Sequence, residues 1–314
     1  MLADMGRTGT RAALGLLTGV TAVAVWLGPV SAAGATGGPH ARPAGVSLHQ
    51  RIVFDSDRSG TRQLYEVNAH GNGIKRLTFT GENVDPAWSA DGTRIVFASN
   101  RGGTFGVYTI QADGSSVNLV TASSGFDGTP AWSPDGTRIV FASNRDGDFD
   151  IYTVSPDGTG LHQVTNTAGY DWQPTWSPDG TKIAFAGRHG SNFDIYVVNA
   201  DGSGMVQRTT DAADDFEPAW SPDGTRLAFT SRRSGTFDVW TMNADGTGLR
   251  NVTANPAKDL DPAWDPNGGR LVFASNRTGS YQLYSIQTDG SGGRQLTSTG
   301  SLNEFPSWGL TTTP

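Results

Sequence analysis

Carboxylate and amide side chains recur at one position of this sequence, three residues before a proline that is itself repeated. They are Asn83, Asp127, Asp171, Asp215, Asp259 and Asn303. Two carboxylates on either side of a glycosidic bond can act as general acid and general base, so Asp171 and Asp215 are candidates for that chemistry. The structural alternative is that each aspartate caps a turn or pairs with an arginine.

Basic side chains recur in loops that we expect on the same face. They are Arg58, Arg101, Arg145, His189, Arg233 and Arg277. Aromatic residues near the carboxylates do not recur in every repeat, so they are better indicators of function than residues that build each repeat. Aromatic rings beside carboxylates are typical of a surface that binds a peptide or glycan, although such rings can also pack between loops. We predict that the binding residues are Asp127, Asp171, Asp215, Asp259, Phe126, Tyr170, Trp172 and Phe216.

A strict internal repeat must position these side chains. Tryptophans recur every 44 residues, at Trp88, Trp132, Trp176, Trp220, Trp264 and Trp308. Each period contains four short runs rich in β-branched and aromatic residues, separated by turns such as "SPDG" and "ADG". Four strands in a period of this length predict one blade of a propeller. The sequence therefore predicts an all-β fold, a six-bladed β-propeller of four-stranded antiparallel blades.

The order of the strands predicts how the ring closes. The repeats begin on a second strand near Arg51 and end on a first strand around Trp308. The C-terminal strand can therefore complete the first blade as its innermost strand. Closure of this kind leaves no open sheet edge.

Other catalytic or metal-binding patterns are not evident. The sequence has no G-x-S-x-G motif and no cysteine, and its five histidines lack a metal-binding spacing. Asp146, Asp148 and Asp150 alternate in one loop and could hold calcium, but the other ligands of a calcium loop are missing, and a solvated hairpin loop is the better interpretation. We expect no metal and no cofactor.

The N-terminus predicts export. Arg7 and Arg11 precede an apolar run from Ala12 to Leu27, and small residues follow it, which is typical of a cleaved signal peptide. We expect residues 1–33 to be the signal peptide, residues 34–47 a flexible linker, and residues 48–314 the propeller. The alternative is an uncleaved anchor, for which the apolar run is short. No membrane span remains after cleavage.

The charge of the chain limits the class of partner. The formal net charge is −7, and no stripe of lysine and arginine is present, so nucleic acid is a poor partner. The absence of cysteine excludes disulfides and thiol catalysis. We expect a monomer.

The pattern "PxWSPDGTRIVFASNR…DIYxxxADG" resembles the WD40-like (PD40) propeller repeats of the TolB family, from about Arg51 to Trp308. The resemblance implies an exported protein of the periplasm or cell envelope that binds another envelope protein or peptide. TolB itself joins an α/β domain to its propeller, and too few residues precede Arg51 here for such a domain. The chain therefore looks like the propeller alone.

Two functions of different classes remain open. Because no catalytic constellation is evident, we expect a non-catalytic module that binds a protein or peptide, with a glycan as a second candidate ligand. The alternative is a carbohydrate-active enzyme, a glycan lyase or glycosidase, that uses Asp171 and Asp215 as acid and base. A purely structural scaffold is the third possibility, because one propeller fold serves many functions.

Overall fold

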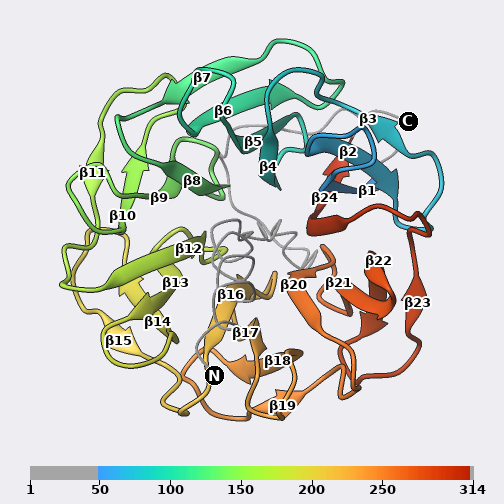
Figure 1. Ribbon diagram of the computed structural model, residues 1–314. Coiled ribbons are helices and arrows are strands. Elements are labelled where there is room, and N and C mark those ends of the chain that lie inside the picture. Colours follow the sequence, from blue (N-terminus) through green and yellow to red (C-terminus); the bar gives the residue numbers. More distant parts are fainter. Residues whose placement is uncertain (1–48, 312–314) are drawn as a thin grey trace, which may run out of the picture.

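Six four-stranded antiparallel sheets are arranged as blades around one axis (Figure 1). The computed structural model describes residues 49–311, so the predicted signal peptide and linker lie outside the described residues. The predicted six-bladed, all-β propeller is confirmed. Among the described residues, no helix is long and apolar enough to cross a membrane.

We name the blades A to F in chain order and give the strands of each from the axis outward. Blade A contains β24 (Asn303–Thr311), β1 (His49–Ser56), β2 (Gln63–Asn68) and β3 (Lys75–Arg76). Blade B contains β4 (Asn83–Trp88), β5 (Arg94–Ser99), β6 (Gly106–Gln111) and β7 (Asn118–Thr121). Blade C contains β8 (Asp127–Trp132), β9 (Ile139–Ser143), β10 (Asp150–Val154) and β11 (His162–Gln163).

The remaining three blades repeat this order. Blade D contains β12 (Tyr170–Trp176), β13 (Lys182–Arg188), β14 (Asp194–Asn199) and β15 (Val206–Gln207). Blade E contains β16 (Asp215–Trp220), β17 (Arg226–Ser231), β18 (Asp238–Asn243) and β19 (Arg250–Asn251). Blade F contains β20 (Asp259–Trp264), β21 (Arg270–Thr278), β22 (Ser280–Gln287) and β23 (Arg294–Gln295).

The second strand of each blade forms the core because both of its faces are covered. In β5, Ile95, Val96 and Phe97 are successive residues and all are fully buried. The ring of Phe97 stacks on Tyr108 of the third strand, with 5.9 Å between ring centroids. Continuous burial without alternation is what blades packed face to face require, since one blade cannot bury its own surfaces.

The "SPDG" turns place the first two strands of a blade. In blade C, the Ser133 hydroxyl donates to Oδ1 of Asp135 at 2.6 Å, and the same oxygen accepts the backbone N–H of Thr137 at 3.0 Å. Gly136 has a φ of 68°, in the left-handed region that favours glycine. The turn therefore follows from residue type at each position.

Each innermost strand contains a bulge at the residue before its repeated proline. In β4 the register shifts between Val84 and Ala87, and Asp85 has a φ of 56°. The same conformation recurs at Asp85, Thr129, Gln173, Glu217, Asp261 and Phe305, with φ between 49° and 57°. A left-handed residue that is not glycine costs about 1–3 kcal/mol, so the surrounding structure must impose it.

The last strand closes the ring in the predicted way. Strand β24 pairs with β1 in antiparallel register, from His49 opposite Thr311 to Ser56 opposite Asn303. All six innermost strands begin at the same end of the propeller, which we call the mouth face. The "SPDG" and "ADG" turns lie at the other end, which we call the turn face.

Candidate functional site

The predicted carboxylates and bases meet on the mouth face as six pairs, one in each blade. In blade C, Arg145 donates to Asp127 at 3.0 Å, and in blade E, Arg233 donates to Asp215 at 2.7 Å. The six pairs, which we call the mouth pairs, are Arg58–Asn303, Arg101–Asn83, Arg145–Asp127, His189–Asp171, Arg233–Asp215 and Arg277–Asp259. Five of the bases belong to the loop between the second and third strands, and Arg277 lies at the end of the second strand, so each pair joins this part of the blade to the innermost strand.

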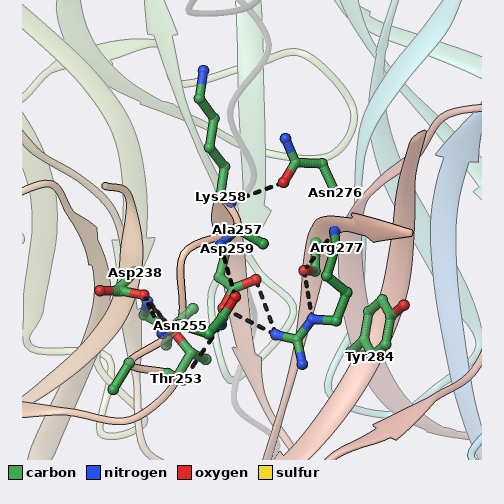
Figure 2. Close-up of polar contacts among 12 residues, drawn as sticks. Asp238, Thr253, Asn255, Ala257, Lys258, Asp259, Asn276, Arg277 and Tyr284 are labelled. Carbon is green, nitrogen blue, oxygen red and sulfur yellow. Dashed lines mark hydrogen bonds and ion pairs between the residues drawn. The ribbon is translucent and has the colours of Figure 1, made fainter. Parts of the chain in front are cut away.

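Blade F shows how completely such a pair is held (Figure 2). The guanidinium of Arg277 donates to both oxygens of Asp259, at 3.1 and 3.0 Å, and its Nε donates to Ser275 at 2.8 Å. It also lies over the ring of Tyr284, 4.5 Å from the centroid. Asn255 donates to Asp259 from the neighbouring loop. The carboxylate is therefore saturated with donors and fully buried.

Blade D carries the one imidazole among the mouth pairs. Nε2 of His189 lies 2.7 Å from Oδ1 of Asp171, and the ring lies against Tyr196, with 4.4 Å between centroids. The hydrogen bond with Asp171 raises the pKa of His189, and this effect outweighs burial, which lowers it. This pair, unlike the arginine pairs, can change its charge near neutral pH.

The predicted binding residues are mostly covered. Asp127, Asp171, Asp215 and Asp259 are each 0% exposed, and Trp172 and Phe216 are each 5% exposed. Tyr170 differs, with 49% of its surface exposed. The geometry therefore supports the structural alternative for the aspartates, because each is fully buried and one or both of its oxygens pair with the base of its own blade. Oδ2 of Asp127 and Oδ1 of Asp215 have no hydrogen-bond partner among residues 49–311.

The aromatic residues pack between the loops of blades B, C and D. Trp172 meets Phe149 edge-on, with 4.6 Å between centroids, and also lies 5.5 Å from Phe126. Phe126 continues to Phe105, and Phe149 continues to Tyr170 at 6.0 Å. We call these five rings the aromatic row. Its exposed end is Tyr170, so the row supports one ring that a partner can reach.

A second ring of side chains lies nearer the axis, at the bulged residues before the prolines. Oδ2 of Asp261 accepts the backbone N–H of Phe305 at 3.2 Å, and Oε2 of Glu217 accepts that of Asp261 at 2.7 Å. In the same way, the side chain of Gln173 accepts the backbone N–H of Glu217, and the side chain of Asp85 accepts that of Thr129. We call Asp85, Thr129, Gln173, Glu217, Asp261 and Phe305 the axial ring. Its side chains join successive blades.

Five carboxylates gather around this ring, and we call them the acidic cluster. They are Asp55, Asp85, Glu217, Asp261 and Glu304, and none is more than 9% exposed. Arg62 bridges two of them, with 3.1 Å to Asp55 and a second bond to Glu304.

Burial disfavours the charged forms of Asp55, Asp85, Asp261 and Glu304. It raises the pKa of Asp55 to about 7, with Arg62 opposing and Glu304 adding to the shift. Burial first, and then the charge of Glu217, raise the pKa of Asp261 well above its usual range. Oδ1 of Asp85 and Oδ1 of Asp261 have no hydrogen-bond partner among residues 49–311. The axis is thus a buried acidic environment with spare acceptors.

Sequence reasoning did not find most of this cluster. It selected the position three before each proline, where every blade has an amide or carboxylate. The position directly before the proline varies among Asp, Thr, Gln, Glu and Phe. That variation in an otherwise strict repeat is the signal that could have identified Asp85 and Asp261, whereas Asp55 and Glu304 depend on strand pairing in blade A.

The alternating aspartates of blade C have other roles. Asp146 accepts the Tyr152 hydroxyl at 2.7 Å, and Asp150 accepts Gln163 at 3.0 Å and Thr165 at 3.2 Å. Within residues 49–311, no group of three or more His, Cys, Asp or Glu residues is arranged to hold a metal ion.

Comparison with known proteins identifies the family. A family model described as the TolB beta propeller domain matches residues 34–122, 118–216 and 212–312. The chain belongs to this TolB propeller family. No curated protein sequence matches it.

Solved structures share the propeller of this TolB-family chain. TolB from Acinetobacter baumannii has a TM-score of 0.74 and 22% identity, covering 82% of this chain and 66% of its own. A putative TolB from Agrobacterium tumefaciens has a TM-score of 0.65 and 22% identity, covering 85% and 94%. An oligogalacturonate lyase in complex with manganese has a TM-score of 0.57 and 17% identity, covering 78% and 73%. The chain spans slightly less than two thirds of the first of these proteins, and at these identities the likeness concerns the fold.

Proposed function

We propose that this TolB-family propeller is an exported, non-catalytic module that binds a protein or peptide of the cell envelope through its mouth face. The observation that carries the proposal is the acidic cluster, which lies just inside the face that presents Tyr170. Five buried carboxyl groups share one arginine, and burial disfavours the charged forms of four of them, so a positively charged group that reaches the axis would stabilise their charged forms. The two TolB proteins among the structural neighbours support an envelope partner.

The residues predicted from sequence divide into two roles in this proposal. Tyr170 contacts the partner directly, because it is the exposed member of the aromatic row. Phe149 contacts Tyr170, and Trp172 and Phe126 pack against Phe149 in turn. Phe216 packs against Phe193, at 4.9 Å between centroids. The aspartates Asp127, Asp171, Asp215 and Asp259 fix the loops that form the rim.

Binding is favoured over the alternative of glycan cleavage. An acid–base pair must reach the substrate, but Asp171 and Asp215 are fully buried. Asp171 is engaged by His189 and Asp215 by Arg233. A cleavage step would first have to break two mouth pairs.

The test compares peptides of opposite charge on the purified protein. We expect basic peptides to bind more tightly than acidic peptides of the same length, with affinity falling as salt increases. Tyr170→Ala should weaken binding of a selected basic peptide by about 5–10-fold, as expected for an aromatic contact residue. Leu161→Ala is the matched control, since Leu161 is 47% exposed and precedes the outer strand β11 on the turn face. Equal binding of acidic peptides, or an unchanged Kd for Tyr170→Ala, would refute the proposal.

A further inference from the structure

Two hollows open on the turn face, where the turns of neighbouring blades meet. The hollow between blades D and E has a volume of about 640 Å³, and the one between blades C and D about 940 Å³. They share Pro178 and Asp179, and their walls come from equivalent residues of successive blades. We call them the D–E hollow and the C–D hollow. Volumes of this size suit a small ligand.

A basic residue of the second strand determines whether such a hollow is filled. At two other blade boundaries an arginine lies over the repeated tryptophan, Arg94 over Trp132 at 4.2 Å and Arg226 over Trp264 at 4.6 Å. In the D–E hollow this position is Lys182, which donates to Asn199 at 2.9 Å. Among residues 49–311, no cation lies over the Trp220 ring, so the space beside this ring is not filled by a basic side chain.

Arg208 distinguishes the D–E hollow from every other blade boundary. The equivalent residues are aliphatic and buried, and they are Leu77, Val120, Val164, Val252 and Leu296. Arg208 instead lines the hollow. Its Nε is buried and has no hydrogen-bond partner among the described residues, and none of their ion pairs includes its guanidinium. A buried guanidinium N–H without an acceptor is costly, and a ligand in the hollow can supply that acceptor.

Two carboxylates, Asp223 and Asp245, also line the D–E hollow, and the charge of Arg208 contributes to the lowered pKa of Asp245. Asp223 accepts the Ser221 hydroxyl through Oδ1 at 2.6 Å, and Asp245 accepts the Thr247 hydroxyl through Oδ1 at 2.7 Å. Both residues are exposed, which leaves Oδ2 of each available. The bond from Thr247 lowers the pKa of Asp245, and for Asp223 burial raises the pKa but the bonds from Ser221 and Thr225 outweigh it. Both side chains are therefore ionised at neutral pH.

We propose that the D–E hollow binds a small ligand carrying both a carboxylate and an ammonium group, namely a free amino acid or a short peptide. The carboxylate binds Arg208, which forms no direct ion pair within the described residues, and the ammonium binds Asp223 and Asp245. An apolar side chain lies against Pro178 and Trp220. A simple anion fits less well, because the three aspartates that line the hollow outnumber Lys182 and Arg208.

The C–D hollow is an internal comparison for this site. It has the same turns and the equivalent tryptophan, Trp176, and Arg138 lines it while its guanidinium donates to the Thr153 hydroxyl at 2.8 Å. The residue equivalent to Arg208 is Val164, so the guanidinium that binds the carboxylate in the D–E hollow has no counterpart at that position. We therefore expect no carboxylate ligand in the C–D hollow. The site lies on the face opposite the mouth and does not depend on the function proposed above.

The test is calorimetric titration of the purified protein with leucine and the dipeptide Leu-Gly. N-acetyl-leucine amide, which lacks both charges, and glucuronate, which lacks the ammonium, are the comparison ligands. We expect leucine or the dipeptide to bind and neither comparison ligand to do so. If no amino acid or dipeptide binds up to about 10 mM, or if glucuronate binds in their place, the proposal is wrong.

Two variants test whether binding depends on Arg208 and on the unfilled space beside Trp220 in the D–E hollow. Arg208→Val introduces the residue of blades B, C and E, so it should fold, and we expect at least about a tenfold loss of affinity. Lys182→Arg restores the longer side chain that covers the tryptophan at two other boundaries, and it should also weaken binding. Arg250→Ala is the control, because Arg250 is exposed and bonds the carbonyl of Asp289 on the outer rim. Unchanged affinity in folded Arg208→Val would overturn the assignment.

Discussion

The mouth pairs and the axial ring are built at neighbouring positions of the same six strands, yet they differ in how strictly they repeat. Every mouth pair joins an amide or carboxylate to a base, and each acid or amide is fully buried. The axial ring has the same backbone conformation in all six blades but four polar residue types and one phenylalanine. A repeated conformation therefore does not require a repeated side chain. Where the side chain is constant it serves the blade, and where it varies it is free to create a local environment such as the acidic cluster.

The largest expected effect comes from breaking a mouth pair. Arg233→Met leaves Asp215 buried without its cation, and we expect a loss of about 3–5 kcal/mol in the free energy of unfolding. Arg232→Met is the neighbouring control, since its pair with Asp214 is more exposed and should contribute less than about 1 kcal/mol. Urea unfolding measures both. Equal losses in the two variants would contradict a structural role for the mouth pairs.

The acidic cluster should make stability fall as pH rises. Burial raises the pKa of Asp55 to about 7, whereas an unfolded aspartate titrates near 4, so the folded chain holds an extra proton between these values. This stabilisation is complete below about pH 4 and lost as the pH rises through about 7. About three pKa units correspond to at most about 4 kcal/mol.

Asp55→Asn tests this contribution because the amide stays neutral at every pH. Urea unfolding between pH 4 and 8 should show a flatter profile than that of the original protein. Asp148→Asn, in an exposed loop, is the control and should leave the profile unchanged. A variant profile as steep as the original would show that Asp55 is not the titrating group.

The smallest effect concerns the one mouth pair that contains histidine. The pKa of His189 is raised by its hydrogen bond with Asp171, so its contribution is complete below about pH 6.5 and is lost as the pH rises through the raised value. Because the ring is partly exposed, we expect a change below about 1 kcal/mol. His189→Arg should remove this dependence by restoring the charge of the other blades. Urea unfolding of both proteins at pH 5 and 8 measures this dependence. If the free energy of unfolding differs between the two pH values by the same amount in His189→Arg as in the original protein, His189 is not its source.

The fold was predictable because its determinants repeat. The tryptophan every 44 residues and the "SPDG" turns specify strand number and order, and the offset of the ends specifies the closing strand. The mouth pairs were predictable for the same reason, since strand reversal alone brings Arg233 to the end of the blade where Asp215 lies.

The burial of the predicted site and the acidic cluster were not predictable from the pattern. An exposed and a buried aromatic residue look alike in a loop sequence, and Tyr170 and Trp172 are two positions apart with 49% and 5% exposure. The bulge that turns Glu217 toward the next blade depends on a left-handed backbone before a proline, for which no residue type is specific. The special position of Arg208 was equally hard to predict. An arginine next to an outer strand is common, and only the alignment of the blades shows that the equivalent residues are aliphatic.

The pairing of β24 with β1 also sets the order of assembly. Arg58 and Asn303 are 245 positions apart, so the first blade cannot be completed until the last strand has been synthesised. Blades B to F can form from local contacts, whereas closure must bring together the two ends of the ring at a large entropic cost. Until then β1 is an unprotected edge beside its missing neighbour. The propeller therefore has a late, all-or-none final step, and a chain shortened before residue 303 should accumulate as an open, aggregation-prone arc rather than as a slightly weaker ring.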